Sequence, residues 1–186
     1  MFPSGPLYVP GAERLTPKLR RAFDFARRHD IFVLSTTDSH GTDDSEFRHL
    51  PPHCIRKTDG QRKIDDTLFP RPCLLENKPI DRNLLEIVKR NRQVIIEKQS
   101  WDVFSNPVTE RILRALPPHA VVFGLPLEYS VRMACLGLRR LQIKTALVSD
   151  AVRPLVARDG DRALEEMREA GVEFVTLDTL LEISAI

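Results

Sequence analysis

The chain has 186 residues, enough for one domain with a substantial core and too few for two of ordinary size. Its residues are 42% hydrophobic and 29% charged, and the formal net charge of only +2 argues against a nucleic-acid-binding protein. No apolar run approaches the length of a membrane span, and the N-terminus has neither the basic nor the apolar region of a signal peptide. We therefore expect a single cytoplasmic domain, residues 1–186, that binds neither nucleic acid nor membrane.

Helical and strand patterns alternate along the chain. The predicted helices span residues 15–29, 81–91, 106–116, 128–142 and 161–171. The predicted strands span residues 31–36, 93–98, 120–125, 145–150 and 173–178. These runs are continuously apolar and rich in β-branched residues, which indicates strands covered on both faces. The pattern predicts an α/β fold, a three-layer, Rossmann-like arrangement of a parallel sheet between helices with right-handed crossovers.

One segment, residues 37–80, does not follow this alternation. It is polar and contains five prolines, and connections of this length in compact domains are usually functional. It follows the carboxyl end of strand 31–36, where open α/β sheets bind their ligands. Three cysteines, Cys54, Cys73 and Cys135, have no metal-type spacing and are interpreted as reduced thiols.

The insertion carries residues that are able to bind a metal ion. Asp38 and His40 are one residue apart at the strand end, His53 can fold back onto them, and Glu46 lies between. Two imidazoles with one or two carboxylates suit zinc, iron(II) or manganese. Spacing alone equally fits a solvated loop in which His53 is a surface residue.

Lys98 ends the predicted strand 93–98. A lysine at the carboxyl end of a parallel strand points at the ligand edge, where it can stabilise an oxyanion or hold a carboxylate. Trp101 and Phe104 follow and would wall an aromatic pocket. The alternatives are a lysine that extends its ammonium group into water and two aromatic core residues.

The stretch GLPLEYS, residues 124–130, joins a buried strand to a helix. Ser130 at such an elbow is either a nucleophile or an ordinary N-cap. Strands 31–36, 93–98 and 120–125 should converge on one pocket bordered by Asp38, Lys98 and Ser130.

Taken together, these segments resemble the isochorismatase-like cysteine hydrolases, and among them the nicotinamidases, from near Leu7 to about residue 178. The motifs are PSGPLYVPGAE, TTDSH, HLPPHC, EKQSWDVF and GLPLEYSVRMACLGLRRLQIKTALVSDAV, in this order. The resemblance implies a six-stranded parallel sheet, of which five strands are visible here. It also implies a small-molecule ligand and a homo-oligomer.

The resemblance assigns roles to individual residues. It implies a divalent metal, zinc or alternatively iron or manganese, held by Asp38, His40 and His53 with Glu46 as a possible fourth ligand. Lys98 takes the place of the catalytic lysine. In nicotinamidases the metal holds the pyridine nitrogen of the substrate, and a cysteine at the elbow attacks the amide.

Three departures from the family pattern concern the chemistry. Ser130 stands at the cysteine position, and a hydroxyl is harder to deprotonate than a thiol. Pro126 follows the position of the family's cis bond, so we expect a cis Leu125–Pro126 bond and the loss of one oxyanion N–H donor. No residue matches the general-base aspartate of the first strand, because Met1 falls after that place.

These departures predict a catalytically impaired hydrolase of small amides. The alternatives are a non-catalytic, metal-dependent binder of a small heteroaromatic ligand, or an oligomeric scaffold. For the unmatched first strand, either the natural protein is longer or strands 31–36 and 120–125 pair directly.

Overall fold

The computed structural model describes residues 3–183, with the backbone alone for Ile183. The strands are β1 (Val33–Asp38), β2 (Cys73–Leu75), β3 (Gln93–Lys98), β4 (His119–Gly124), β5 (Lys144–Val152) and β6 (Glu173–Val175). The helices are α1 (Thr16–Arg28), α2 (Leu84–Arg90), α3 (Thr109–Leu113), α4 (Arg132–Arg140), α5 (Ala157–Glu169) and α6 (Leu177–Ile183). None of these helices is both long and apolar enough to cross a membrane.

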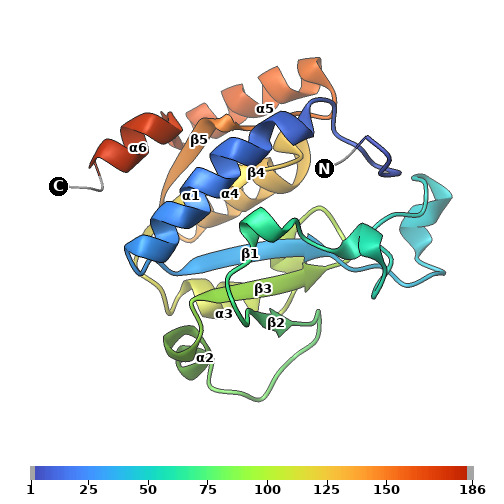
Figure 1. Ribbon diagram of the computed structural model, residues 1–186, viewed down its shortest axis with the longest axis horizontal. Helices are drawn as coiled ribbons and strands as arrows, with labels where there is room; N and C mark the ends of the chain where they lie inside the picture. The colour runs from blue at the N-terminus through green and yellow to red at the C-terminus, as the bar shows by residue number, and fades with distance from the viewer. Residues whose placement is uncertain (1–2, 184–186) are drawn as a thin grey trace.

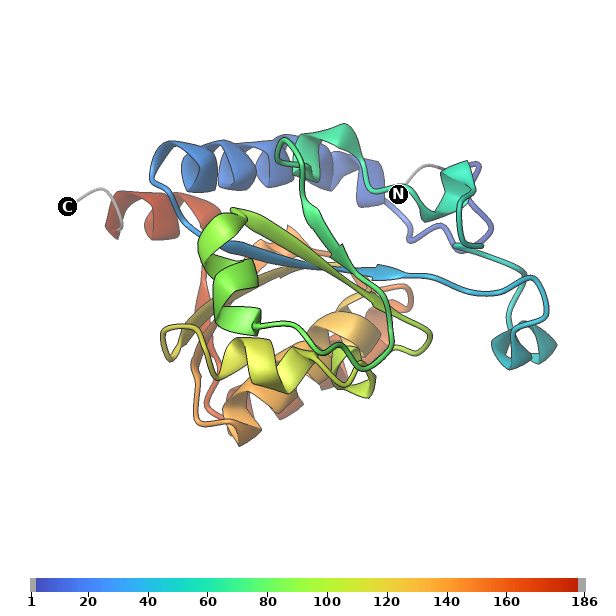
Figure 2. The ribbon, with the colours of Figure 1, turned by 90° about the horizontal axis from the view of Figure 1, so that it is seen from below.

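Helices cover both faces of the strands. α1 and α6 lie on one face, and α3, α4 and α5 lie on the other (Figures 1 and 2). Apolar side chains fill both interfaces: Phe23 of α1 packs edge to face on Phe123 of β4, with ring centroids 6.1 Å apart, and Ile96 of β3 packs in a cluster with Ile87 of α2 and Ile112 of α3. Burial on both faces explains why the strand sequences are continuously apolar. The predicted α/β class with parallel strands between helices is confirmed.

All strand pairs are parallel, but they form two three-stranded sheets instead of one continuous sheet. The strand orders are β1-β3-β2 and β4-β5-β6. β2 lies inside the insertion and was not among the five predicted strands. β3 is central in its sheet, and all its residues are buried. The strand-forming runs are visible in the sequence, whereas strand pairing joins distant residues and is not.

β1 and β4 are neighbours without a hydrogen-bonded ladder between them. Val33 of β1 and Phe123 of β4 pack in one apolar cluster with α1, and Leu34 and Val122 pack in another on the opposite face. Each strand is bonded along one edge alone, so the other edge has no ladder partner among residues 3–183. The alternative that these two strands pair directly is therefore wrong. Val121 of β4 is 44% exposed, so β4 is less protected from water than β3.

The end of the chain differs from the predicted strand 173–178. β6 stops at Val175, and α6 begins at Leu177. The backbone N–H of Leu177 donates to Oδ1 of Asp150 (2.8 Å), which satisfies one of the free N–H groups at the helix start. Leu177 is 1% exposed, so its burial also favours the helix over a longer strand.

Gly137 marks a close contact between α4 and the ring of Phe104. A Cβ at Gly137 would lie 2.0 Å from Cε2 of Phe104. We expect Gly137→Ala to lower the free energy of unfolding by roughly 1–2 kcal/mol, because overpacking outweighs the better helix propensity of alanine. Urea denaturation measures this. Gly60→Ala is the control, since its nearest neighbouring atom would be 3.6 Å away. Equal stabilities of the two variants would contradict the contact.

Candidate active site and metal centre

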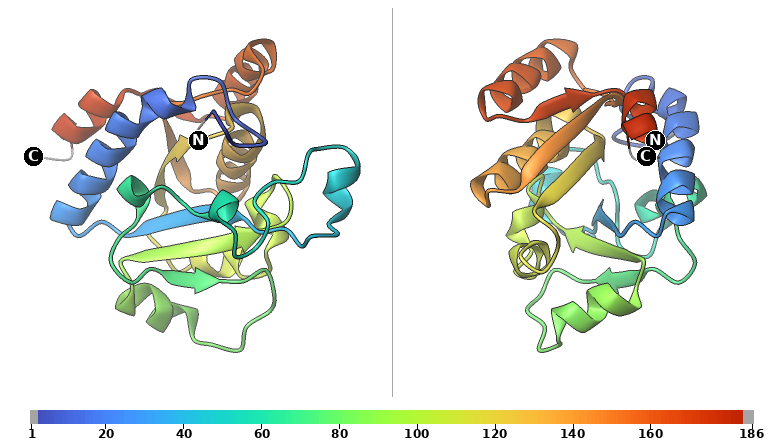
Figure 3. Two further views of the ribbon diagram at one scale, coloured as in Figure 1. Left: turned by 45° about the vertical axis from the view of Figure 1, so that its right-hand side comes forward. Right: turned by 90° about the vertical axis from the view of Figure 1, so that its left-hand side faces the viewer.

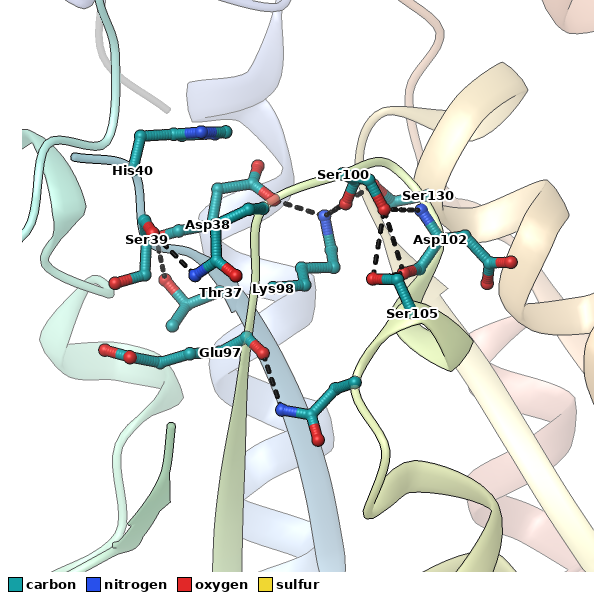
Figure 4. Close-up of polar contacts among 12 residues, drawn as sticks. Thr37, Asp38, Ser39, His40, Glu97, Lys98, Ser100, Asp102, Ser105 and Ser130 are labelled. Carbon is teal, nitrogen blue, oxygen red and sulfur yellow. Dashed lines mark hydrogen bonds and ion pairs between the residues drawn. The ribbon is translucent and has the colours of Figure 1, made fainter. Parts of the chain in front are cut away.

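The carboxyl ends of β1 and β3 bring two oppositely charged side chains together. Asp38 and Lys98 are the last residues of these strands and are partners in the parallel ladder. Nζ of Lys98 donates to the carboxylate of Asp38, to the carbonyl oxygen of Ser100 (2.9 Å) and to Oγ of Ser130 (3.3 Å) (Figure 4). Lys98 is 2% exposed. All three ammonium hydrogens therefore have acceptors inside the protein.

Ser130 belongs to a π-helical turn, η6 (Leu127–Val131), between β4 and α4. The preceding Leu125–Pro126 bond is cis, as the sequence analysis expects. The Ser130 side chain caps neither η6 nor α4, whose N-cap residue is Val131. The N-cap interpretation is therefore wrong, and the hydroxyl faces Lys98 instead.

Glu128 links this turn to a neighbouring segment of the chain. Its side chain is buried, and Oε1 accepts hydrogen bonds from the backbone N–H groups of Leu155 (2.9 Å) and Val156 (2.7 Å). Hydrogen bonds to a charged acceptor are stronger than neutral ones. The turn that carries Ser130 is thus tied to the segment that precedes α5.

Three residues of the insertion form a cluster able to bind a metal ion. The ligand atoms of His40, Glu46 and His53 lie within 4.8 Å of one another. His40 is 1% and His53 is 5% exposed, and Nε2 of His40 lies 3.5 Å from Oε2 of Glu46. Asp38 is not part of this cluster. Two imidazoles and one carboxylate are the donors of a catalytic zinc site with an open fourth position.

Hydrogen bonds leave one ring nitrogen of each histidine available to a metal. Nδ1 of His40 contacts Oδ2 of Asp44 (2.9 Å), and Nδ1 of His53 contacts the carbonyl oxygen of Pro51 (2.9 Å). Because a carboxylate and a carbonyl only accept, each Nδ1 carries the hydrogen, and Nε2 of the neutral ring keeps its lone pair. A hydrogen bond from the N–H of Glu46, followed by the one from His40, lowers the pKa of Asp44. The donor set therefore fits zinc.

The segment that carries these ligands is fastened to the strands. It extends beyond the carboxyl end of β1 (Figure 3), where the N–H of His40 donates to the carbonyl oxygen of Cys54 (3.1 Å) and the N–H of Arg56 donates to that of His40 (2.9 Å). Further along, Nε2 of Gln61 donates to Oε1 of the buried Glu97 on β3 (3.0 Å). The long insertion is thus ordered by backbone and side-chain bonds where its ligands lie.

Cys54 lies next to the site but is poorly suited to act as a nucleophile. Burial, and then the nearby carboxylate of Asp38, raise the pKa of the Cys54 thiol to about 11. Little thiolate is therefore present at neutral pH. We expect Cys54→Ser to leave zinc affinity within about threefold of the wild-type value, because Cys54 is outside the cluster of His40, Glu46 and His53. A chelator-competition titration measures the affinity, and a loss of about tenfold or more would make Cys54 a metal ligand or a support for one.

The two aromatic residues that were expected to wall a pocket differ in environment. Trp101 stacks on Tyr129, the neighbour of Ser130, with ring centroids 4.7 Å apart and an interplanar angle of 24°. Phe104 packs in the apolar core against α4, with the guanidinium of Arg140 over its ring. Trp101 therefore borders the elbow, and Phe104 is a core residue.

Two side chains of the site were not predicted from the sequence. Asp44 orients His40, and a signal for it exists: Asp44 precedes a short 3-10 turn (Ser45–Arg48), and its Oδ1 accepts from the N–H of Glu46, as capping residues do. Tyr129 has no such signal, because its stacking partner Trp101 is far away in the sequence.

Comparison with solved structures supports the fold. A pyrazinamidase of Pyrococcus horikoshii in complex with zinc is 24% identical, with a TM-score of 0.77, and the match covers 94% of this chain and 92% of that one. An isochorismatase-like hydrolase from Alkaliphilus metalliredigens is 20% identical, with a TM-score of 0.79 and coverages of 98% and 91%. N-carbamoylsarcosine amidase from Thermoplasma acidophilum is 23% identical, with a TM-score of 0.73 and coverages of 95% and 90%.

Sequence comparison defines the family. No protein of curated function matches the chain at the sequence level. The sequence model of the isochorismatase domain, however, matches residues 1–179, nearly the whole chain. The fold, with parallel strands between two helical layers, agrees with this match. The chain belongs to the isochorismatase family.

Proposed function

We propose that the protein hydrolyses the C–N bond of small amides with Ser130 as the nucleophile, and that this serine makes it slow. The observation that carries the proposal is the contact of 3.3 Å between Oγ of Ser130 and Nζ of the buried Lys98. The cluster of His40, Glu46 and His53 begins two residues after Asp38, the charged partner of Lys98. Two of the structural neighbours, the pyrazinamidase and the carbamoylsarcosine amidase, are named as amidases.

The reaction we propose proceeds through an acyl-serine. Oγ of Ser130 attacks the amide carbonyl, the C–N bond breaks, and the hydroxyl proton leaves with the amine as ammonia. Water then hydrolyses the ester and restores the serine. The ammonium group of Lys98 stabilises negative charge that develops next to Oγ.

Two features of the elbow support slow turnover. A serine hydroxyl is weakly nucleophilic without an adjacent base. The ammonium group of Lys98 donates a hydrogen bond to this hydroxyl and, as an ammonium, cannot accept its proton. Pro126 has no backbone N–H, so this turn has one oxyanion donor fewer than the same turn with another residue at position 126. In other enzymes the loss of one such donor lowers the rate about 100- to 1000-fold.

We further propose that His40, Glu46 and His53 hold zinc. A bound zinc ion would act as a Lewis acid that fixes a nitrogen or oxygen atom of the ligand next to Ser130. The single open position of such a three-ligand site would leave room for one ligand atom.

Ammonia release tests the proposed hydrolysis. The zinc-loaded protein is incubated with nicotinamide, pyrazinamide and simple aliphatic amides, and Ser130→Ala is the matched control. The proposal expects slow release that the substitution abolishes. Equal rates for the two proteins would reject Ser130 as the nucleophile.

A second candidate function is metal-dependent binding of a small heteroaromatic ligand without turnover. The stacked pair Trp101 and Tyr129 favours it, because such a pair offers an aromatic surface at the turn that carries Ser130. Isothermal titration of nicotinic acid and nicotinamide into the zinc-loaded protein separates the two functions. Binding without any ammonia release supports this second function.

A further inference from the structure

A surface cleft between α2 and α3 is lined by three arginine side chains and shares no residue with the candidate active site. Arg82 precedes α2, Arg111 lies in α3, and Arg114 is the C-cap residue of α3. The cleft has a volume of about 390 Å³, within the range of small-molecule sites, about 300–1,000 Å³. We propose that this cleft binds a small organic molecule that carries a phosphate monoester group.

The first argument is the charge of the cleft. The guanidinium of Arg114 is paired with the carboxylate of Glu110 through two hydrogen bonds of 2.9 and 2.7 Å. Arg82 and Arg111 form no ion pair with any residue in the described part of the chain, 3–183. A phosphate monoester carries a charge of about −1.5 to −2 at neutral pH. One such group therefore balances both arginines, whereas one carboxylate balances only one of them.

The second argument is the way in which the arginines are held. Nη1 of Arg111 donates to the carbonyl oxygen of Ile80 (3.4 Å), two residues before Arg82. The side chain of Asn83 caps α2 and so fixes the direction of the chain directly after Arg82. A guanidinium presents its N–H groups as a planar fork that matches two phosphate oxygens. The cleft thus has two such forks on opposite sides, one from each helix region.

The third argument is the apolar part of the cleft. Leu84, Leu85 and Ala115 also line it. Leu84 is 6% exposed because it packs in the core, whereas Leu85 is 50% exposed. Covering an exposed leucine with apolar ligand surface is favourable. The apolar lining beside the arginines therefore favours an organic phosphate over the inorganic ion.

Isothermal titration of phenyl phosphate into the full chain tests the ligand class, because this compound joins a phosphate monoester to a compact apolar ring. The buffer is free of phosphate and of low ionic strength, since salt screens exposed charges. We expect saturable binding, with benzoate and inorganic phosphate each at least about tenfold weaker. Binding of benzoate as tight as that of phenyl phosphate would overturn the phosphate assignment. Equally tight binding of inorganic phosphate would overturn the organic part.

Two variants test the place of binding. Arg82→Gln and Arg111→Gln should each weaken phenyl phosphate binding at least about tenfold, because each removes charge-assisted hydrogen bonds. Arg90→Gln is the matched control: Arg90 is an exposed arginine of α2 that pairs with Glu86 (3.6 Å) and does not line the cleft. It should leave binding within about twofold of the wild-type value. Unchanged binding in both cleft variants, or an equal loss in Arg90→Gln, would overturn the proposal.

A second copy of the chain is the other occupant that the cleft could take. Sedimentation velocity separates the two cases. A dimer that dissociates in both cleft variants, in a protein that does not bind phenyl phosphate, would overturn the proposal in favour of an interface between copies. The test is independent of the proposed function, since it needs no hydrolysis. Phenyl phosphate held at the metal cluster would be insensitive to Arg82 and Arg111, and this result too would count against the cleft.

Discussion

Ser130→Cys is expected to raise the rate of amide hydrolysis by at least about 100-fold, because a thiol has a much lower pKa than a hydroxyl and its thiolate is the stronger nucleophile. Nζ of Lys98 lies 3.3 Å from the side-chain oxygen that the sulfur would replace. A cation at this distance lowers the pKa of a thiol further. Ammonia release from nicotinamide at pH 7.5, in the presence of zinc, measures the gain.

Ser105→Cys is the matched control for this gain. Ser105 lies in the segment that follows β3, and its hydroxyl is 3.0 Å from Oγ of Ser100. Nζ of Lys98 contacts the carbonyl oxygen of Ser100 but not Ser105. Its substitution introduces a thiol without placing it at the elbow. A rate for Ser130→Cys no higher than that for Ser105→Cys would contradict the assignment of the elbow as the reacting position.

His40→Ala is expected to lower zinc affinity by at least about 100-fold, since it removes one of three ligands. Asp44→Asn should lower zinc affinity about 10- to 100-fold, because Asp44 orients the ring of His40 through a hydrogen bond of 2.9 Å. Competition with a chromophoric chelator measures both affinities.

His49→Ala is the matched control for the metal site. His49 is exposed and directly follows the 3-10 turn that contains Glu46, yet it is outside the cluster of metal-binding residues. Its removal should leave zinc affinity unchanged. If His49→Ala lowers zinc affinity as much as His40→Ala does, the ion binds outside the cluster of His40, Glu46 and His53.

Local sequence patterns predicted the elements of this fold well where burial alone decides them. The run 93–98 became β3, whose residues are all buried, and the helix pattern 15–29 became α1. The pattern failed at residues 176–178, because the contact of Leu177 with Asp150 that starts α6 joins residues far apart in the sequence.

The division into two sheets also depends on long-range pairing. No local feature of strands 31–36 and 120–125 reveals that β1 and β4 share apolar clusters without sharing a ladder. A strand's sequence indicates its burial, but its partner is set by the whole fold.

The candidate site was predictable to the extent that strand ends determine it. Asp38 and Lys98 were placed at one edge from the rule that parallel strands end together, and they do contact each other. The separation of Asp38 from the histidine cluster was not predictable, because it depends on the backbone bonds of the insertion near Cys54 and on the charge of Lys98.

Mass spectrometry of the reacting protein tests the central claim most directly. Zinc-loaded wild-type protein is mixed with pyrazinamide, quenched with acid and digested. The account predicts an acyl group on a small fraction of the peptide that contains Ser130, with none in Ser130→Ala, because attack by the hydroxyl is slow and water then hydrolyses the serine ester. Ammonia released by wild-type protein and Ser130→Ala at the same rate, with Ser130 unmodified, would contradict the account.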